Sequence, residues 1–302
     1  MKKYTMVLLM VMAAFFWSGA FIAGKFSVSS FTPGMLTFLR FGIASLIILT
    51  VLIVREPENW KLRKSELPAV IILGLVGMIG YHLLFFEALK YTTAINASMV
   101  VATNPMITAV IAAIVAGENL SYKRITLILV ALTGVVLTLT NWDIGVITRM
   151  EMNIGDLIML IAVCCWAVYS VLVKRFMAGF TPLKLTAYSF ISCVIMLAPF
   201  VVFSKMNIES LSTAPLNAWM AVVYMAVFPT VIGYLIQQMS IKKVGASQTS
   251  IYINLVPVFS LFLATLILGE SVTVQKIASS GMIIVAVFLY SRDKIKLEEK
   301  YV

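Results

Sequence analysis

The strongest constraint in this chain is a pattern of residues that recurs at a fixed distance. Trp17 recurs as Trp166, 149 positions later, and the Phe-Thr-Pro sequence that begins at Phe31 recurs at Phe180 with the same spacing. A second set of matched positions follows in the same order in both halves: Gly80 with Gly233, Tyr81 with Tyr234, Pro105 with Pro257, and Gly117 with Gly269. The sequence therefore predicts two copies of one structural unit.

Both copies consist of apolar segments that are long enough to cross a lipid bilayer. The chain has a mean hydropathy of +1.02 and 12% charged residues, whereas a soluble domain carries about 25%. A helix needs about 20 apolar residues to cross about 30 Å of hydrocarbon. We therefore predict an all-α integral membrane protein with ten transmembrane helices, at residues 4–26, 33–54, 67–89, 94–116, 122–140, 154–174, 182–203, 215–238, 246–268 and 273–291.

The predicted helices divide into two five-helix repeats, residues 4–140 and residues 154–291. Because five is an odd number, the second repeat must enter the membrane in the inverted orientation. Two inverted repeats that face each other across the membrane midplane are a common architecture of secondary transporters. The repeat pattern therefore favours a membrane carrier.

The positive charges are unevenly distributed between the two sides of this predicted topology. The net charge is +10, which on its own is also typical of nucleic-acid-binding proteins. With the N-terminus in the cytoplasm, 16 of the 23 Lys and Arg residues fall in cytoplasmic segments and five in outside segments. This excess follows the positive-inside rule. It places both termini in the cytoplasm and accounts for the basic charge without a nucleic-acid partner.

No sequence pattern indicates a metal, a cofactor or a catalytic site. Cys164, Cys165 and Cys193 fall inside predicted helices, with a spacing that matches neither zinc nor redox sites. His82 is the only histidine, and the Asp residues are scattered at helix ends, so the sequence offers no metal-ligand set. It also has no GxxxxGK[ST] phosphate-binding loop. We therefore predict no catalytic residues, no metal and no cofactor.

A set of short motifs, ordered alike in the two halves, resembles the EamA-domain family of the drug/metabolite transporter superfamily. The resemblance covers about residues 4–291. It rests on Trp17, Lys25, Pro33, Leu39, Arg40, Phe41, the FFEALKY stretch at 85–91, Asn104, Pro105, Gly117, Glu118, Gly155, Asp156, Trp166, Ala167, Pro182, Pro257, Gly269 and Glu270. It implies a ten-helix carrier of the bacterial plasma membrane with a central cavity, and such carriers often export amino acids or other small metabolites.

The fourth and ninth predicted helices carry features expected of a substrate site. Each contains a proline with an amide side chain nearby, Pro105 with Asn104 and Pro257 with Asn254. A proline inside a helix frees a backbone carbonyl and kinks the helix. Interrupted helices at matching positions of two repeats point to a transporter binding site, whereas helix packing through hydrogen bonds is the structural alternative. We predict that both asparagines line the cavity.

Five further residues are candidates for the cavity lining. Arg40 lies within a predicted helix, where a charge needs a reason; its planar donor fork suits a carboxylate, and bonding to helix ends or lipid headgroups is the alternative. Trp17 and Trp166 lie inside their helices rather than at the membrane interfaces where Trp collects, which predicts a paired aromatic wall. Tyr234 and Gln237 can add hydrogen bonds. Packing or lipid contact is the alternative for these four.

Two titratable residues are candidates for proton coupling. His82 lies near the middle of the third predicted helix, and a histidine side chain ordinarily titrates close to neutral pH. Glu87 lies five residues later, near the outer end of that helix, and can also pair with Lys90. A packed, neutral histidine and a Glu87–Lys90 pair are the structural alternatives.

The sequence as a whole favours a secondary transporter that exports amino acids or related small metabolites by alternating access. Multidrug efflux is the alternative within the carrier class, and a membrane-embedded enzyme or a channel are alternatives outside it. We expect a small-molecule substrate, contact with membrane lipid, and either a proton gradient or facilitated flux as the driving force. Because one chain holds both repeats, we expect a monomer.

Overall fold

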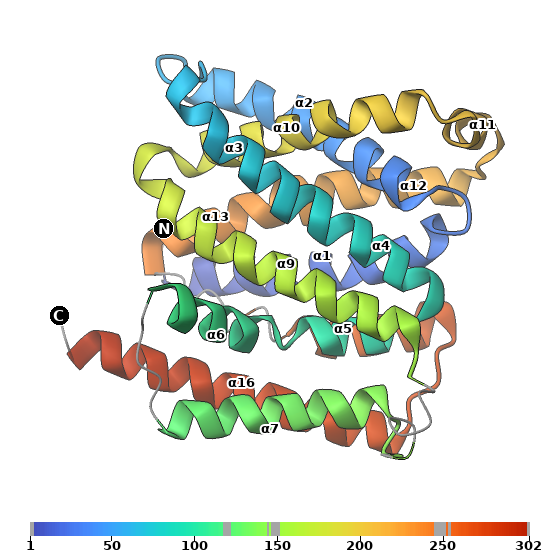
Figure 1. Cartoon of the computed structure of the whole chain (residues 1–302), viewed down its shortest axis with the longest axis vertical. Helices are drawn as coiled ribbons and strands as arrows, with labels where there is room; N and C mark the ends of the chain where they lie inside the picture. Colours follow the sequence, from blue (N-terminus) through green and yellow to red (C-terminus); the bar gives the residue numbers. More distant parts are fainter. Residues whose placement is uncertain are drawn as a thin grey trace.

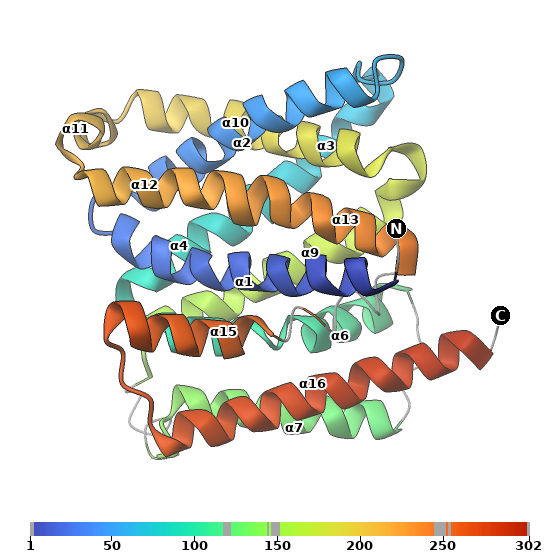
Figure 2. The same ribbon diagram turned by 180° about the vertical axis from the view of Figure 1, so that it is seen from behind.

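The computed structural model describes residues 3–116, 122–143, 145, 152–244, 252 and 255–300. Within these ranges the regular secondary structure is entirely helical. The long helices lie side by side in one bundle, as the two opposite views in Figure 1 and Figure 2 show.

The helices follow one another closely along the chain. In the first half they are α1 (Lys3–Ser27), α2 (Pro33–Arg55), η1 (Lys64–Glu66), α3 (Leu67–Leu73), η2 (Gly74–Gly80), α4 (Tyr81–Tyr91), α5 (Ala94–Val101), α6 (Asn104–Ala116) and α7 (Tyr122–Leu139). In the second half they are α9 (Ile154–Phe176), η3 (Met177–Gly179), α10 (Pro182–Val202), α11 (Lys205–Thr213), α12 (Leu216–Met225), η4 (Ala226–Ile232), α13 (Gly233–Val244), α15 (Val256–Leu263), η5 (Ala264–Leu268) and α16 (Val274–Lys300).

Seven helical stretches are long and apolar enough to cross a membrane: Thr5–Ser27, Pro33–Arg55, Lys64–Tyr91, Ala94–Ile111, Ile154–Val173, Pro182–Val202 and Leu216–Ser240. Three shorter apolar helices accompany them, at Ile125–Thr138, Val256–Leu268 and Val274–Tyr290. Large apolar side chains also cover the outside of the bundle, and Leu8, Leu46 and Phe200 are each at least 70% exposed. A continuous apolar exterior of this kind is stable in lipid rather than in water. The protein is therefore an integral membrane protein.

The repeated Phe-Thr-Pro sequence starts a long helix in each half. The Thr32 hydroxyl accepts a hydrogen bond from the backbone N–H of Met35 at 3.2 Å, and Pro33 occupies the first turn of α2. Thr181 accepts from the backbone N–H of Lys184, also at 3.2 Å, at the start of α10. Threonine caps the free N–H groups of a helix start, and proline fits the first turn because it has no N–H to lose.

Three predicted helices, 67–89, 215–238 and 246–268, each contain a π-helical stretch that the sequence patterns did not indicate. These stretches are η2, η4 and η5; η2 ends immediately before Tyr81, and η4 ends two residues before Tyr234. Pro229 lies inside η4, where its missing N–H interrupts the regular hydrogen-bond ladder. The two tyrosines, which are matched positions of the repeat, therefore each follow a local change in helix winding.

The prolines near the predicted kinks begin new helices. The predicted helix 94–116 is divided into α5 and α6 by a turn at residues 102–103, and Pro105 lies in the first turn of α6. Pro257 lies in the first turn of α15. Asn254 lies outside the described residues, so the structure does not place it.

Helices of one half pack mainly against helices of the other half. α1 packs against α12 and α13, while its repeat counterpart α9 packs against α4 and η2. α2 packs against α10, α5 against α15, and α7 against α16. The α7–α16 pair lies at one end of the stack of helices in both views (Figure 1 and Figure 2).

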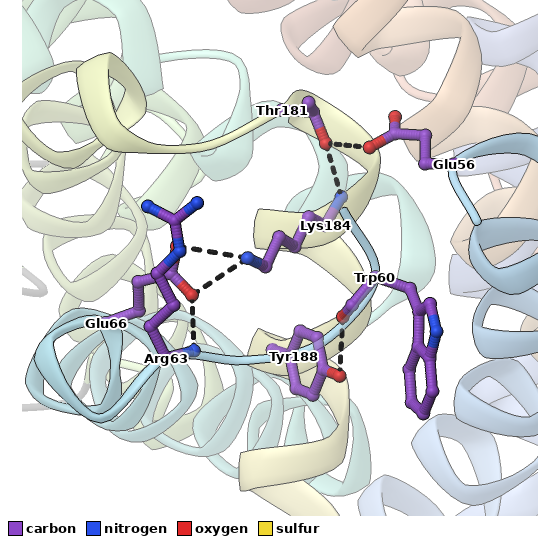
Figure 3. Close-up of polar contacts among 7 residues, drawn as sticks. All are labelled: Glu56, Trp60, Arg63, Glu66, Thr181, Lys184 and Tyr188. Atoms are coloured by element: carbon purple, nitrogen blue, oxygen red, sulfur yellow. Dashed lines mark hydrogen bonds and ion pairs between the residues drawn. The ribbon is translucent and has the colours of Figure 1, made fainter. Parts of the chain in front are cut away.

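A polar cluster ties the segment after α2 to the start of α10, and we call it the Lys184 cluster (Figure 3). Its members are Glu56, Trp60, Arg63, Glu66, Thr181, Lys184 and Tyr188. Lys184 Nζ lies 3.0 and 2.9 Å from the two carboxylate oxygens of Glu66. The Thr181 hydroxyl donates to Glu56 at 2.7 Å, and the Tyr188 hydroxyl donates to the Trp60 carbonyl at 2.8 Å.

Candidate functional site

The bundle contains a partly open cavity of about 90 Å³, which we call the central cavity. Its lining residues come from α1, α2, α4, α5, α6, α9, α13 and α15. The helices of both halves therefore meet around one space.

Matched positions of the repeat face this space from opposite halves. Trp17 and Trp166 both line the central cavity, as do Tyr81 and Tyr234. The ring of Trp166 lies 4.8 Å from that of Tyr81 and 5.8 Å from that of Tyr234, measured between centroids. The indole N–H of Trp17 donates to the carbonyl of Pro229 at 3.0 Å. The aromatic side chains thus form part of the wall, and Trp17 also joins α1 to η4.

Arg40 extends from α2 to the cavity and is held by η4. Its Nε donates to the Thr230 hydroxyl at 2.7 Å, and that hydroxyl donates to the Met225 carbonyl at 2.7 Å. Pro229 has no N–H to offer this carbonyl, which leaves it free for Thr230. The interrupted helix therefore positions the hydroxyl that orients Arg40.

The charge of Arg40 has no acidic partner within the part of the chain that the structure describes. The ion pairs found there are Glu87–Lys90 and Glu66–Lys184, and the described cavity lining contains no Asp or Glu. Arg40 is 4% exposed. Insertion scales assign an arginine at the centre of a membrane helix a cost of about 2.5–3.5 kcal/mol. The cavity consequently carries a fixed positive charge.

A second polar group in the lining also lacks a partner. The Tyr234 hydroxyl is buried and forms no hydrogen bond with any described residue. Buried polar groups normally have a partner, and an unpaired one is costly. Tyr234 and Arg40 both line the central cavity, so the unpaired hydroxyl and the unneutralised cation face the same space.

The two candidates for proton coupling lie in different surroundings. His82 lines the cavity, its Nδ1 lies 3.0 Å from the Met78 carbonyl, and its ring packs edge-on against Phe41. Glu87 is not part of the lining and pairs with Lys90 at 2.8 Å, with both side chains about one third exposed. The structure therefore brings His82 to the cavity and leaves Glu87 outside it.

The predicted amide residues that the structure describes also reach the cavity. Asn104 and Gln237 both belong to the lining. Asn104 Oδ1 accepts from the Thr108 hydroxyl at 3.3 Å, and its Nδ2 approaches the Val163 carbonyl at 3.5 Å. These contacts are long for hydrogen bonds, so the amide is weakly held.

The sequence interpretation missed several residues of this site, and Tyr81 and Thr230 are the two polar ones among them. Tyr81 could have been found, since it is the repeat counterpart of Tyr234. Thr230 had no comparable signal: its role depends on the π-helical stretch around Pro229, and hydrophobic patterns do not show helix winding.

Comparison with known proteins agrees with the helical bundle. The model of the EamA-like transporter family matches residues 4–140 and again residues 153–292. A crystal structure described only as "Crystal structure of protein" superposes with a TM-score of 0.63 at 21% identity, covering 96% of this chain and 98% of that chain. At this identity the likeness concerns the fold alone.

Several relatives have been named as transporters. The chain is 33% identical over 292 residues to "Uncharacterized transporter YyaM" of Bacillus subtilis (strain 168), covering 96% of this chain and 95% of that protein. It is 28% identical to an uncharacterized transporter of Archaeoglobus fulgidus, with 97% and 100% covered. It is 24% identical to a "Probable terminal-alkyne amino-acid exporter" of Streptantibioticus cattleyicolor, with 97% and 95% covered. The chain therefore belongs to the EamA-like transporter family.

Proposed function

We propose that this protein is a secondary transporter of the bacterial plasma membrane that exports amino acids or related small metabolites. The observation that carries this proposal is the central cavity, to which both halves contribute matched residues, Trp17 with Trp166 and Tyr81 with Tyr234. Substrate sites of secondary transporters lie at such an interface between repeats. The relative named as a probable amino-acid exporter supports the substrate class.

The proposed architecture has ten transmembrane helices in two inverted repeats, residues 4–140 and 154–291, with both termini in the cytoplasm. Reciprocal packing supports it, since α1 packs against α13 while α9 packs against α4. The beginning of α1 and the end of α16 lie at the same end of the bundle (Figure 1). An even number of spans requires this placement.

Alternating access requires a closure at each end of the cavity. At the end where α2 finishes and α10 begins, the Lys184 cluster joins the two halves (Figure 3). At the opposite end, Phe31 packs edge-on against Trp219, with the centroids 5.2 Å apart. Glu270 there accepts from the backbone N–H of Ala94 at 2.7 Å. We propose that transport breaks and reforms these two sets of contacts in turn.

The proposed working unit is a monomer, because one chain supplies every described wall of the cavity. Membrane lipid surrounds it as solvent. A proton gradient is the proposed driving force, and His82 supports it as a titratable residue of the lining. Glu87 contributes less support, since it pairs with Lys90 outside the lining.

Counterflow tests the transport function directly. Purified protein in proteoliposomes is preloaded with a pool of amino acids and related metabolites, and the loss of each compound is followed by mass spectrometry. Selective, saturable loss of one group, accelerated by the same compound outside, is the expected result. Retention of the whole pool by folded protein would count against the proposal.

A further inference from the structure

We infer that Arg40 and the Tyr234 hydroxyl form a carboxylate-binding subsite, so that the substrates are small monocarboxylates and need no ammonium group. This inference rests on the transport function proposed above and names the chemistry of its substrate. It concerns one end of the ligand, the charged head, and places the apolar body against the aromatic wall.

The first step is the missing counter-ion. Arg40 is the one charged residue in the described cavity lining. Of the buried acids that the structure describes, Asp156 accepts hydrogen bonds from Thr92 and Asn96, and Glu66 pairs with Lys184. Residues 245–254, which the structure describes only at position 252, contain no Asp or Glu in their sequence. An anionic ligand would therefore supply the negative charge that the described cavity lining lacks.

The second step is the set of free donors. Thr230 binds Arg40 through Nε, and the terminal nitrogens of the guanidinium make no hydrogen bond to a described residue. A planar guanidinium with free terminal N–H groups can hold a carboxylate in a bidentate manner. Tyr234 adds a buried hydroxyl without a partner, from a different helix. The Arg40 guanidinium and the Tyr234 hydroxyl are thus two donors without an acceptor, and the two oxygens of one carboxylate could accept from both.

The third step concerns the rest of the ligand. The remaining lining is mostly aromatic or aliphatic and includes Phe21, Phe85, Trp166, Val101 and Val256. An ammonium group would find no carboxylate among these side chains, and it would lie close to a fixed cation of the same sign. A carboxylic acid without the amino group should therefore bind at least as tightly as the corresponding amino acid.

A matched series of compounds tests this preference by ligand-induced thermal stabilisation of the purified protein in lipid nanodiscs. Each apolar side chain is tested as an acid, an amino acid, an amide and an amine. One set is 4-methylpentanoate, leucine, 4-methylpentanamide and 3-methylbutylamine. The corresponding sets built on phenylalanine and on tryptophan are the other two. We expect the acids to bind at least as tightly as the amino acids. We expect amides and amines to bind at least about tenfold more weakly, since they lose a hydrogen-bonded charge.

Variants assign the preference to the two residues. Arg40→Gln should weaken binding of the acids about 10- to 100-fold, and Tyr234→Phe about tenfold, with amide binding unchanged in both. Arg40→Lys should keep the preference for acids over amines, because it keeps the charge. Arg55→Gln makes the same chemical change at the exposed end of α2 and should change nothing. If Arg40→Gln does not fold, Tyr234→Phe and Arg40→Lys still decide the question.

The outcomes separate this inference from the transport proposal. Amines that bind as tightly as acids, an absence of acid binding to folded wild-type protein, or unchanged acid binding in folded Tyr234→Phe and Arg40→Gln would each overturn the carboxylate subsite. Counterflow of some other compound would leave the transport function standing in that case. Absence of counterflow for every compound would overturn the transport function itself.

Discussion

Trp17 and Pro229 are joined by a hydrogen bond across the two halves of the chain: the indole N–H of Trp17 donates to the Pro229 carbonyl at 3.0 Å. Trp17 lines the central cavity, and Pro229 interrupts the helix that holds Thr230 and, through it, Arg40. One contact therefore connects the aromatic wall, the interrupted helix and the cation of the proposed substrate site.

Replacing Trp17 by phenylalanine removes this bond and keeps an aromatic ring in the wall. An interhelical hydrogen bond in a membrane protein contributes about 0.6 kcal/mol, so we expect a small loss of stability and a clear rise in the KM for counterflow. Trp142→Phe is the matched control. The Trp142 indole N–H donates to the Ser279 hydroxyl at 2.9 Å, and neither residue belongs to the cavity lining. An equal change in KM for both variants would contradict a role for Trp17 in the site.

The buried Lys184–Glu66 pair allows a test of the cluster that joins the halves. Lys184 is 1% exposed, and Lys184→Met would leave a largely buried carboxylate without its partner. Breaking a buried ion pair costs about 3–5 kcal/mol of folding stability. We therefore expect a large drop in the thermal unfolding temperature of this variant. Combining Lys184→Met with Glu66→Leu should restore most of that stability, because neither charge remains.

The exposed pair on α4 is the control for that experiment. Lys90 and Glu87 are about one third exposed, and surface pairs contribute about 0–1 kcal/mol. Lys90→Met should therefore change the unfolding temperature little. A drop as large as that of Lys184→Met would show that the loss does not depend on burial.

A close approach of two helices predicts a steric effect at Gly77. A Cβ atom at Gly77 would lie 2.2 Å from the Tyr169 ring, so Gly77→Ala must displace that buried ring or move η2 away from α9. Overpacking of this kind costs about 1–3 kcal/mol. Gly281→Ala, where no atom lies within 4 Å, should leave stability unchanged or raise it slightly because alanine favours helix. Equal unfolding temperatures for the two variants would argue against this packing.

The proposed topology predicts where reporters will be found. A reporter fused to the C-terminus should be active only as a cytoplasmic reporter, and one inserted into residues 141–153 only as an outside reporter. The cytoplasmic location of the C-terminal reporter follows from the even number of proposed spans. The outside location of the inserted reporter follows from the odd number of spans in the first repeat. Both reporters on the same side of the membrane would rule out the inverted arrangement.

The sequence indicated the site because a polar side chain is costly inside a membrane helix, so its presence there suggests a function. Trp17, Arg40, His82, Asn104, Trp166, Tyr234 and Gln237 were selected as polar or aromatic groups within apolar helices, and they meet around one cavity; that they bind substrate stays a prediction. Glu87 met the same criterion but pairs locally with Lys90. Sequence distance alone could not show which side of α4 faces the cavity.

The π-helical stretches and the buried ion pair could not be predicted from the sequence patterns, for a physical reason. A π-helical stretch such as η4 is as apolar as an α-helix, and the partners of its Pro229 and Thr230, which are Trp17 and Arg40, lie about 190 or more positions away in the sequence. The Lys184–Glu66 pair joins residues 118 positions apart. Neither periodicity nor local spacing carries information about such distant partners.

The most direct test of the central claim is the accessibility of a single cysteine in the cavity. Ala20 lines the central cavity, so Ala20→Cys is made in a background in which Cys164, Cys165 and Cys193 are replaced, and a membrane-impermeant thiol reagent is added to either side of sealed vesicles. Alternating access predicts reaction from each side separately, with a transported substrate slowing both reactions. Reaction from one side alone, or no effect of a transported substrate, would contradict the account.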